Sequence, residues 1–418
     1  MQSQTRHNLL GISGALMAFS AFSIFPALGD DWTQWRGNSR DGLSKETGLL
    51  KSWKPEGPKL LWTAEGLGEG HTSPSVVKGS VYGMGLIEGG EYVWAVNTAT
   101  GKMRWKQKIA NGIELGGSQG GFGPRATPTI IGDKLYTLGV GGEAVCLSIA
   151  KGEILWHKNL VTDFGGRVPQ WGYCESPLID GEKCILTPGG SNTVIALNRN
   201  TGATIWKCEV PGNDAAHYSS AIMATVDGKK ETIHFVAGGV VGISPEGKYL
   251  WRYNEPANRI ANCSTPIYRD GFVFAASGYN TGGGTAKLTS GAKGIEAAPV
   301  YFTREMQNHH GGVVLVGDYL YGFDNSTLTC IDFKTGKTKW RDRSVGKGSV
   351  TYADGMLYAR SEKGPVALVE ANPEAYKELG RFDQPERSRE PSWAYPVISD
   401  GKLYLHDQGK LFCYDVKK

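Results

Sequence analysis

Eight side chains able to bind ligands or move protons recur once in each of eight similar segments of the sequence. Each stands three residues ahead of a position that is proline in five of the segments. The eight are His71, Arg125, Cys174, His217, Cys263, His310, Lys347 and Trp393. Because strand interiors rarely hold such residues, this shared register predicts the rim of one pocket. His, Arg and Lys beside aromatic rings favour a small polar or anionic, carbohydrate-like ligand.

Neighbouring residues extend the candidate site. Histidine is the natural general base because its pKa lies near neutrality, and Tyr can act beside it. The candidate catalytic residues are His310, His217, His71 and Tyr218. The candidate ligand-binding residues are Arg125, Glu175, Asn262, Tyr279, Asn280, Lys287, His309, Lys347 and Trp393. A structural alternative stays open for each of them, because polar side chains at a channel rim also satisfy exposed backbone groups.

The adjacent pair His309 and His310 raises the question of a metal site. Neighbouring residues of a strand face opposite ways, so we expect only His310 on the channel side unless a bulge intervenes. A metal ion would then need His310 together with His217, His71 or Glu175. No H-x-H or H-E-x-x-H spacing supports such a set, and we predict no metal site.

A repeated hairpin must position these side chains. Residues 93–105, 194–206 and 328–340 each read as an apolar strand, an Asp or Asn, a Thr-Gly turn, and a second strand that ends in Trp. Gly can take the left-handed conformation that closes such a turn. The aromatic residues that end the units are Trp62, Trp105, Trp156, Trp206, Trp251, about Phe302, Trp340 and about Phe382. A unit that recurs at this period decides the fold.

Each unit reads as four short strands, which is typical of a propeller blade. The last unit, residues 395–416, supplies three strands, and residues 59–62 form a single strand that lacks its predecessors. Pairing these two segments would close the ring and leave no open sheet edge between its ends. We therefore predict an all-β, eight-bladed β-propeller of four-stranded antiparallel blades as a single domain over residues 59–418. Residues 30–58 are expected to form an N-terminal arm across its body.

The first 29 residues are expected to be a cleaved signal peptide. A short basic start precedes a largely apolar run, and small residues stand at the cleavage positions. No later run is long enough to span a membrane. The sequence therefore predicts a periplasmic or secreted protein, which we expect to be a monomer. A net charge of +4 without a basic cluster argues against nucleic acid as a partner.

Seven Cys without a C-x-x-C pair leave at least one thiol unpaired. Cys184, Cys330 and Cys413 lie in strand-like runs, where a free Cys behaves as a small apolar residue. We therefore interpret most of the cysteines as part of the core.

The Thr-Gly-Lys-x-x-Trp hairpins, the eight units and the Gln34-Trp35-Arg36-Gly37 arm resemble the PQQ-like, quinoprotein-type β-propeller family. The resemblance covers nearly the whole chain after the signal peptide. Besides a ligand binder that can also turn its ligand over, which the channel residues suggest, the resemblance implies two alternatives: a PQQ-dependent dehydrogenase and a non-catalytic scaffold. The scaffold precedent is the lipoprotein of the outer-membrane β-barrel assembly machine, which would imply a protein partner. This chain lacks that protein's lipid-attachment Cys.

The dehydrogenases that this chain resembles hold calcium through a carboxylate and an Asn, use a catalytic Asp, and carry a vicinal Cys pair. This sequence has no Cys-Cys pair, and no Asp matches the catalytic base. Asn280 stands in a loop like that of the Asn ligand, but Ser191 and Asn192 stand where the carboxylate is expected. PQQ is therefore disfavoured, and the cofactor is left unassigned.

Overall fold

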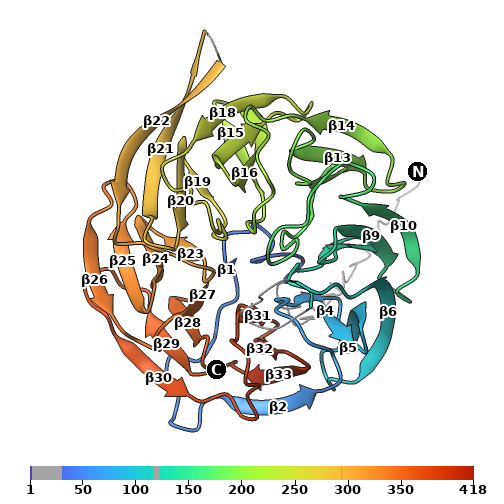
Figure 1. Cartoon of the computed structure of the whole chain (residues 1–418). Helices are drawn as coiled ribbons and strands as arrows, with labels where there is room; N and C mark the ends of the chain where they lie inside the picture. Colours follow the sequence, from blue (N-terminus) through green and yellow to red (C-terminus); the bar gives the residue numbers. More distant parts are fainter. Residues whose placement is uncertain (2–30, 116–122, 293) are drawn as a thin grey trace.

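The computed structural model describes residues 1, 31–115, 123–292 and 294–418. Apart from Met1, the predicted signal peptide lies outside the described residues. Within the described ranges, no helix is long and apolar enough to cross a membrane. The strands form eight sheets arranged in a ring (Figure 1). This arrangement confirms the predicted eight-bladed β-propeller.

Each blade contains four antiparallel strands, numbered here from the innermost outward. Blade 1 contains β3 (Ser75–Val77), β4 (Ser80–Ile87), β5 (Gly90–Asn97) and β6 (Met103–Asn111), and blade 2 contains β7 (Thr129–Ile131), β8 (Lys134–Leu138), β9 (Glu143–Ser148) and β10 (Ile154–Asn159). Blade 3 contains β11 (Leu178–Asp180), β12 (Lys183–Leu186), β13 (Val194–Asn198) and β14 (Thr204–Cys208), and blade 4 contains β15 (Ile222–Val226), β16 (Lys229–Val236), β17 (Gly239–Ile243) and β18 (Tyr249–Tyr253). Blade 5 contains β19 (Ile267–Arg269), β20 (Phe272–Ser277), β21 (Gly282–Gly291) and β22 (Gly294–Thr303), and blade 6 contains β23 (Val313–Val316), β24 (Tyr319–Asp324), β25 (Thr327–Asp332) and β26 (Thr338–Asp342). Blade 7 contains β27 (Gly348–Ala353), β28 (Met356–Ser361), β29 (Val366–Glu370) and β30 (Glu378–Phe382), and blade 8 contains β31 (Val397–Ser399), β32 (Lys402–Asp407), β33 (Lys410–Asp415) and β2 (Lys59–Ala64).

The aligned prolines mark where the inner strands begin. In five blades the inner strand starts directly after the proline, which cannot donate to the strand ladder. The first residue of each such strand pairs with a residue of the second strand of its blade. These pairs are Ser75 with Tyr82, Thr129 with Tyr136, Leu178 with Ile185, Ile267 with Phe274, and Val397 with Tyr404.

Five of the tryptophans that end the units each join one blade to the next, whereas the indole N–H of Trp251 donates to Glu231 of its own blade. The indole N–H of Trp156 in blade 2 donates to the carbonyl of Arg199 in blade 3, at 2.8 Å. Its ring lies on Gly202, where an added Cβ would come within 3.1 Å of the ring. The same contact links Trp62 to Thr98, Trp105 to Ile149, Trp206 to Pro245 and Trp340 to Asn372. The turn glycine is therefore needed both for its positive φ and for the ring that covers it.

Two of the unit-ending aromatics were placed one or two residues too late. In blade 5, Tyr301 rather than Phe302 occupies the tryptophan position, and its hydroxyl donates to the carbonyl of Phe333 at 3.0 Å. In blade 7 that position is Gly380, two residues before Phe382. Trp53 from the N-terminal arm packs against Gly380 and so fills the space of the missing ring.

The ring closes as predicted, because the outermost strand of blade 8 comes from the start of the chain. β2 pairs antiparallel with β33, with Leu60 opposite Tyr414 (Figure 1). Strands from the N-terminal and C-terminal parts of the propeller therefore share one sheet, and their pairing closes the ring.

The N-terminal arm lies against the inner strands of the ring. β1 (Leu43–Ser44) pairs in parallel with β27, and Trp32 bridges to Val76 of β3. Buried Arg40 donates to the carbonyls of Ser176 and Ala221, at 3.1 and 2.8 Å. The remaining blades are reached through Thr33 with Ile130, Trp35 with Thr265, Arg36 with Val313, and Ser44 with Ile398. The arm thus contacts the inner part of all eight blades and blocks the channel.

Candidate functional site

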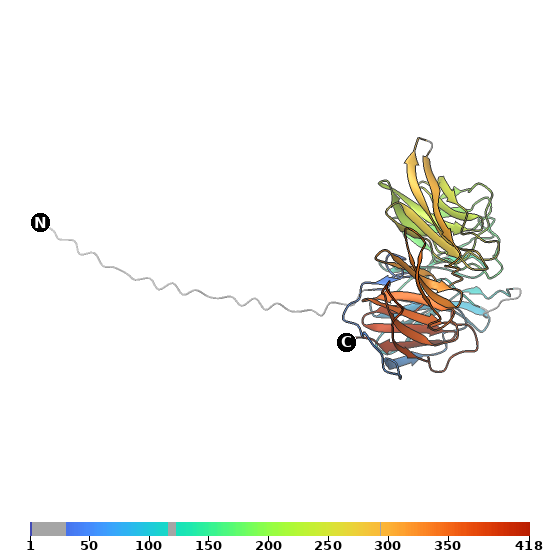
Figure 2. The ribbon, with the colours of Figure 1, turned by 90° about the vertical axis from the view of Figure 1, so that its left-hand side faces the viewer.

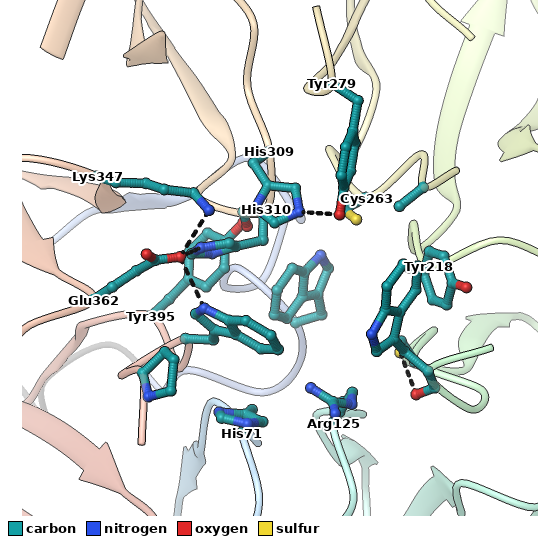
Figure 3. Close-up of a pocket in the computed structure, with 16 residues that line it drawn as sticks. His71, Arg125, Tyr218, Cys263, Tyr279, His309, His310, Lys347, Glu362 and Tyr395 are labelled. Atoms are coloured by element: carbon teal, nitrogen blue, oxygen red, sulfur yellow. Dashed lines mark hydrogen bonds and ion pairs between the residues drawn. The ribbon is translucent and has the colours of Figure 1, made fainter. Parts of the chain in front are cut away.

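One mouth of the channel holds a pocket with a volume of about 220 Å³ (Figure 3). Seven of the eight residues that share the register described above line it: His71, Arg125, Cys174, Cys263, His310, Lys347 and Trp393. They meet because each stands in the loop that leads into an inner strand, and these loops gather at the same end of the ring. Trp35 of the arm also lines the pocket, so the blocked channel gives the pocket a floor.

His217 lies next to this pocket rather than in its lining. Its Nδ1 accepts the backbone N–H of Asn262 at 3.1 Å, and its ring stacks on Tyr218 with centroids 5.5 Å apart. Burial lowers the pKa of His217, which favours the neutral ring that this hydrogen bond requires. Tyr218 itself lines the pocket, edge-on to Trp171 at 5.5 Å.

Glu362 connects three of the lining residues. One of its carboxylate oxygens accepts hydrogen bonds from His310 Nε2, from Lys347 Nζ at 3.1 Å and from Trp393 Nε1 at 2.9 Å (Figure 3). Burial alone would raise the pKa of Glu362, but the hydrogen bond from His310 and the charge of Lys347 outweigh it and lower that pKa to about 2. The carboxylate is therefore ionised and ties blades 6, 7 and 8 together at the mouth.

His310 is held as a hydrogen-bond donor. Burial lowers its pKa, although the carboxylate of Glu362 offsets part of that effect. A neutral imidazole with its proton on Nε2 satisfies Glu362 and leaves Nδ1 as an acceptor. That Nδ1 is buried and has no hydrogen-bond partner among the described residues.

His309 also lines the pocket, so the expectation that the two histidines face opposite ways is wrong. Both precede β23 and lie outside any strand, and the alternation of strand side chains therefore does not apply to them. Two glycines follow: a Cβ on Gly311 would lie 1.9 Å from the carbonyl oxygen of Gly348, and Gly312 has a φ of 67°. His309 Nε2 lies 2.9 Å from the hydroxyl of Tyr279, and burial lowers the pKa of His309 to about 3.

Arg125 and Trp393 form the other side of the pocket. The Arg125 guanidinium lies 5.2 Å from the centroid of the Trp393 ring, and His71 lies 4.6 Å from the same ring. Burial lowers the pKa of Arg125, since the cation loses hydration there. A negative charge placed beside this guanidinium would therefore be stabilised.

The two cysteines of the pocket are unsuited to nucleophilic chemistry. Cys174 and Cys263 are free thiols, and burial raises their pKa to about 11 and about 12. The thiolate is the reactive form, so both are inert at neutral pH. Cys184, Cys330 and Cys413 are buried free thiols within the sheets, in line with their reading as core residues.

Two predicted ligand-binding residues serve the backbone instead of the pocket. The carboxylate of Glu175 is buried and accepts the N–H of Thr187. Asn262 is fully buried, and its Nδ2 donates to the carbonyls of Val236 and Ala237 at 2.9 and 3.2 Å. Both correspond to the structural alternative, in which polar groups near the rim satisfy main-chain groups.

Two others do not line the pocket. Lys287 pairs with Phe272 at one end of β20, whereas Tyr279 follows the other end of that strand. Lys287 is therefore about a strand's length away from the mouth. Asn280 is exposed, with a φ of 62°, and takes no part in the lining.

Sequence reasoning missed Glu362, Trp35, Trp171 and Tyr395, which all line the pocket. A signal for Glu362 existed. It directly follows β28, the second strand of its blade, and the corresponding loop of blade 5 supplied Tyr279. Considering the loop after the second strand of blade 7 as well would have found Glu362.

The residues present do not fit PQQ bound through calcium. Calcium prefers about six to eight oxygen ligands. Among the described lining residues the one carboxylate is Glu362, which already accepts from His310, Lys347 and Trp393. No vicinal Cys pair stands in the sequence to face a quinone ring.

An eight-bladed ring linked by tryptophan hairpins, with a pocket at one mouth, defines the class of PQQ-like β-propellers. The chain belongs to the family whose model is described as outer membrane protein assembly factor BamB, and that model matches residues 89–342 and 310–418.

Individual relatives carry different names. The chain is 24% identical to a tetrathionate hydrolase of Acidithiobacillus ferrooxidans over 433 residues, which is 90% of this chain and 80% of the relative. It is 25% identical to BamB of Burkholderia pseudomallei over 243 residues, or 56% of this chain and 57% of that protein.

Two solved structures share the fold. Quinohemoprotein alcohol dehydrogenase from Comamonas testosteroni aligns with a TM-score of 0.66 at 13% identity, covering 93% of this chain and 80% of that one. BamB from Moraxella catarrhalis aligns with a TM-score of 0.60 at 14% identity, covering 86% and 97%. At these identities the likeness shows the architecture alone.

Proposed function

We propose that this chain is an exported propeller that binds a small anionic, carbohydrate-like ligand in the pocket at the channel mouth. The observation that carries the proposal is the Arg125 guanidinium, 5.2 Å from the Trp393 ring inside that pocket. Arg can pair with a carboxylate while an indole face packs against the C–H groups of a sugar ring. Lys347 adds a second cation, against one carboxylate among the described lining residues.

The relatives support an anion and an exported location. Tetrathionate, which the Acidithiobacillus enzyme hydrolyses by its name, is an anion. The family description and the Burkholderia relative both name outer membrane assembly, which agrees with a signal peptide over residues 1–29. For this chain we favour a sugar acid, because Trp35, Trp171 and Trp393 line the pocket and a small sulfur oxyanion would have no use for aromatic rings.

The geometry supports binding better than turnover. A general base needs an accessible lone pair within hydrogen-bond reach of its substrate. In His310 the Nε2 is engaged by Glu362, and the Nδ1 is buried. His309 is likewise engaged through Nε2 by Tyr279, with a buried Nδ1.

A thermal-shift series tests this function. Glucuronate should raise the melting temperature of the purified protein, since a ligand that binds the folded state stabilises it by mass action. Glucose, its neutral counterpart, should have little effect, and tetrathionate tests the alternative anion. Arg125→Gln should abolish the glucuronate shift, whereas Arg167→Gln, an exposed arginine, should preserve it. The proposal fails if no anion shifts the wild-type protein at millimolar concentration.

A protein scaffold is the second candidate, and one feature of blade 5 favours it. Strands β21 and β22 form a hairpin whose tip stands out beyond the ring (Figure 2), and Val300 and Phe302, nearer the base of this hairpin, are 46% and 40% exposed. Exposed apolar side chains of this kind are common at protein interfaces. A Val300→Ser, Phe302→Ser double variant should then lose partner cross-linking in cells while Arg125→Gln keeps it. The reverse pattern would exclude the scaffold.

A further inference from the structure

We propose that His309, His310 and Glu362 form a binding site for one divalent first-row transition metal ion, for which Zn²⁺ is the probe. Each of the three offers one ligand atom, and these atoms lie within 4.8 Å of one another. Two imidazoles and one carboxylate are the protein ligands of zinc sites that keep a position open for water or substrate. The same set suits other first-row metals. This site goes beyond the proposed anion binding and does not depend on it.

Unsatisfied nitrogen atoms are the second observation that points to a metal. The Nδ1 atoms of His309 and His310 are both buried, and neither has a hydrogen-bond partner among the described residues. Buried polar atoms without partners are uncommon, and each calls for a missing ion or water. A metal ion bound through the Nδ1 of either histidine would give that nitrogen the partner that it lacks.

The surroundings hold the two histidines in place, as ligand side chains require. The hydroxyl of Tyr279 contacts Nε2 of His309 at 2.9 Å, and the hydroxyl of Tyr395 donates to the carbonyl of His310. Gly311 lets the segment lie against the backbone of Gly348 in the next blade. Outer contacts of this kind orient ligands and raise metal affinity.

The positive charge of Lys347 should weaken metal binding, so a variant that lacks this charge tests the site. Its ammonium lies 3.1 Å from the Glu362 oxygen, where it competes with a cation for the same carboxylate. Removing the ammonium should therefore tighten metal binding, whereas removing a ligand should weaken it. A merely structural cluster would show neither effect.

The site also has a consequence for the pocket. His309, His310 and Glu362 line the same cavity as Arg125. A bound dication would add positive charge to that wall and leave an open position for an oxygen of an anionic ligand.

The experiment is a calorimetric titration of the metal-free, full-length mature protein with Zn²⁺ alone. Metal analysis after dialysis is the second measurement. Wild type should bind about one ion per chain, the stoichiometry of a single site. His309→Ala and His310→Ala should weaken binding at least about 100-fold, the upper end of what loss of an outer contact alone costs. Lys347→Met should strengthen it roughly tenfold or more. Circular dichroism on each variant verifies the fold, and His309→Gln replaces any alanine variant that does not fold.

Two controls separate this site from other zinc ligands on the chain. His157→Ala removes an exposed histidine from β10 and should leave the affinity unchanged. A Cys174→Ser, Cys263→Ser double variant removes the thiols of the pocket and should also keep it. The proposal is overturned if wild type binds no zinc at about 100 µM, a concentration far above the Kd of a true zinc site. It is also overturned if the histidine variants bind zinc as tightly as wild type does, or if the thiol variant loses the ion. None of these outcomes bears on glucuronate binding, which is measured without metal.

Discussion

His310 and Glu362 are 52 residues apart in the sequence, and a hydrogen bond from the imidazole Nε2 to the carboxylate joins them at the channel mouth. His310 precedes the inner strand of blade 6, and Glu362 follows the second strand of blade 7. The contact therefore crosses a blade boundary, and the carboxylate also fixes Lys347 and Trp393. One ionised group thus arranges three side chains of the pocket.

Glu362→Gln should destabilise the fold by about 1–2 kcal/mol, because charge-assisted hydrogen bonds from partly buried groups are replaced by weaker neutral ones. The upper end is discounted because Lys347 is about one-third exposed to solvent. Urea denaturation measures the change. Glu305→Gln is the matched control, since its partner Arg341 and Glu305 itself are 43% and 44% exposed. An equal loss in both variants would contradict a special role for Glu362.

Trp156→Ala should cost about 3–5 kcal/mol of unfolding free energy, as expected for truncating a buried aromatic. Its ring covers Gly202, and its N–H satisfies the carbonyl of Arg199 in the next blade. Ile205→Ala, on the outer strand of blade 3 and 45% exposed, should change the stability by less than about 0.5 kcal/mol. Guanidinium unfolding followed by tryptophan fluorescence compares the two. A small loss for Trp156 would show that the blades do not depend on this contact.

The repeat explains why the ring could be predicted and the contents of its channel could not. Pro74 and Trp105 occur at fixed places in units whose strands pair locally, so the sequence alone gave their register. Arg40 belongs to no unit, and it bonds to carbonyls 136 and 181 residues away. Trp53 fills a gap that a glycine leaves in blade 7, which no repeat pattern contains. Contacts of this kind depend on the closed ring, which exists only after folding.

Some residues of the pocket could likewise be predicted from the repeat, and others could not. Arg125 and Lys347 were predicted because they hold the same position in their repeat units, and the propeller brings equivalent positions together at one mouth. His309 was expected to face away because strand alternation was applied to a segment that the glycines hold outside the strand. Lys287 was placed too near because the length of β21 was unknown.

Arg40→Met should destabilise the propeller by about 3–5 kcal/mol, because the buried carbonyls of Ser176 in blade 3 and Ala221 in blade 4 lose this donor. Arg40 is 3% exposed, and burial lowers its pKa to about 9, so its charge is sustained by these bonds and by nearby Glu175. Lys45→Met, at an exposed position of the same arm, should be nearly neutral. Differential scanning calorimetry measures both. If Arg40→Met unfolds like wild type, the arm is only an attachment to a ring that is stable without it.

The stability of the fold should depend on pH through His406. This side chain is 1% exposed, its Nδ1 lies 2.7 Å from the carbonyl oxygen of Thr72, and burial lowers its pKa to about 4 despite that contact. The unfolded chain takes up the proton near pH 6.5, before the folded chain does. Stability from this group is therefore complete above pH 6.5 and is lost as the pH falls toward 4. In His406→Gln the slope of unfolding free energy against pH should drop by up to about 1.4 kcal/mol per unit within this window.

Glu91, Glu175 and Glu231, whose burial raises their pKa to about 7, act in the opposite sense between pH 4.5 and 7, but they are common to both proteins and cancel in the difference. Urea midpoints from pH 4 to 8 provide the measurement: the two curves should run parallel above pH 6.5 and converge below it, and parallel curves throughout would show that folding does not shift the pKa of His406.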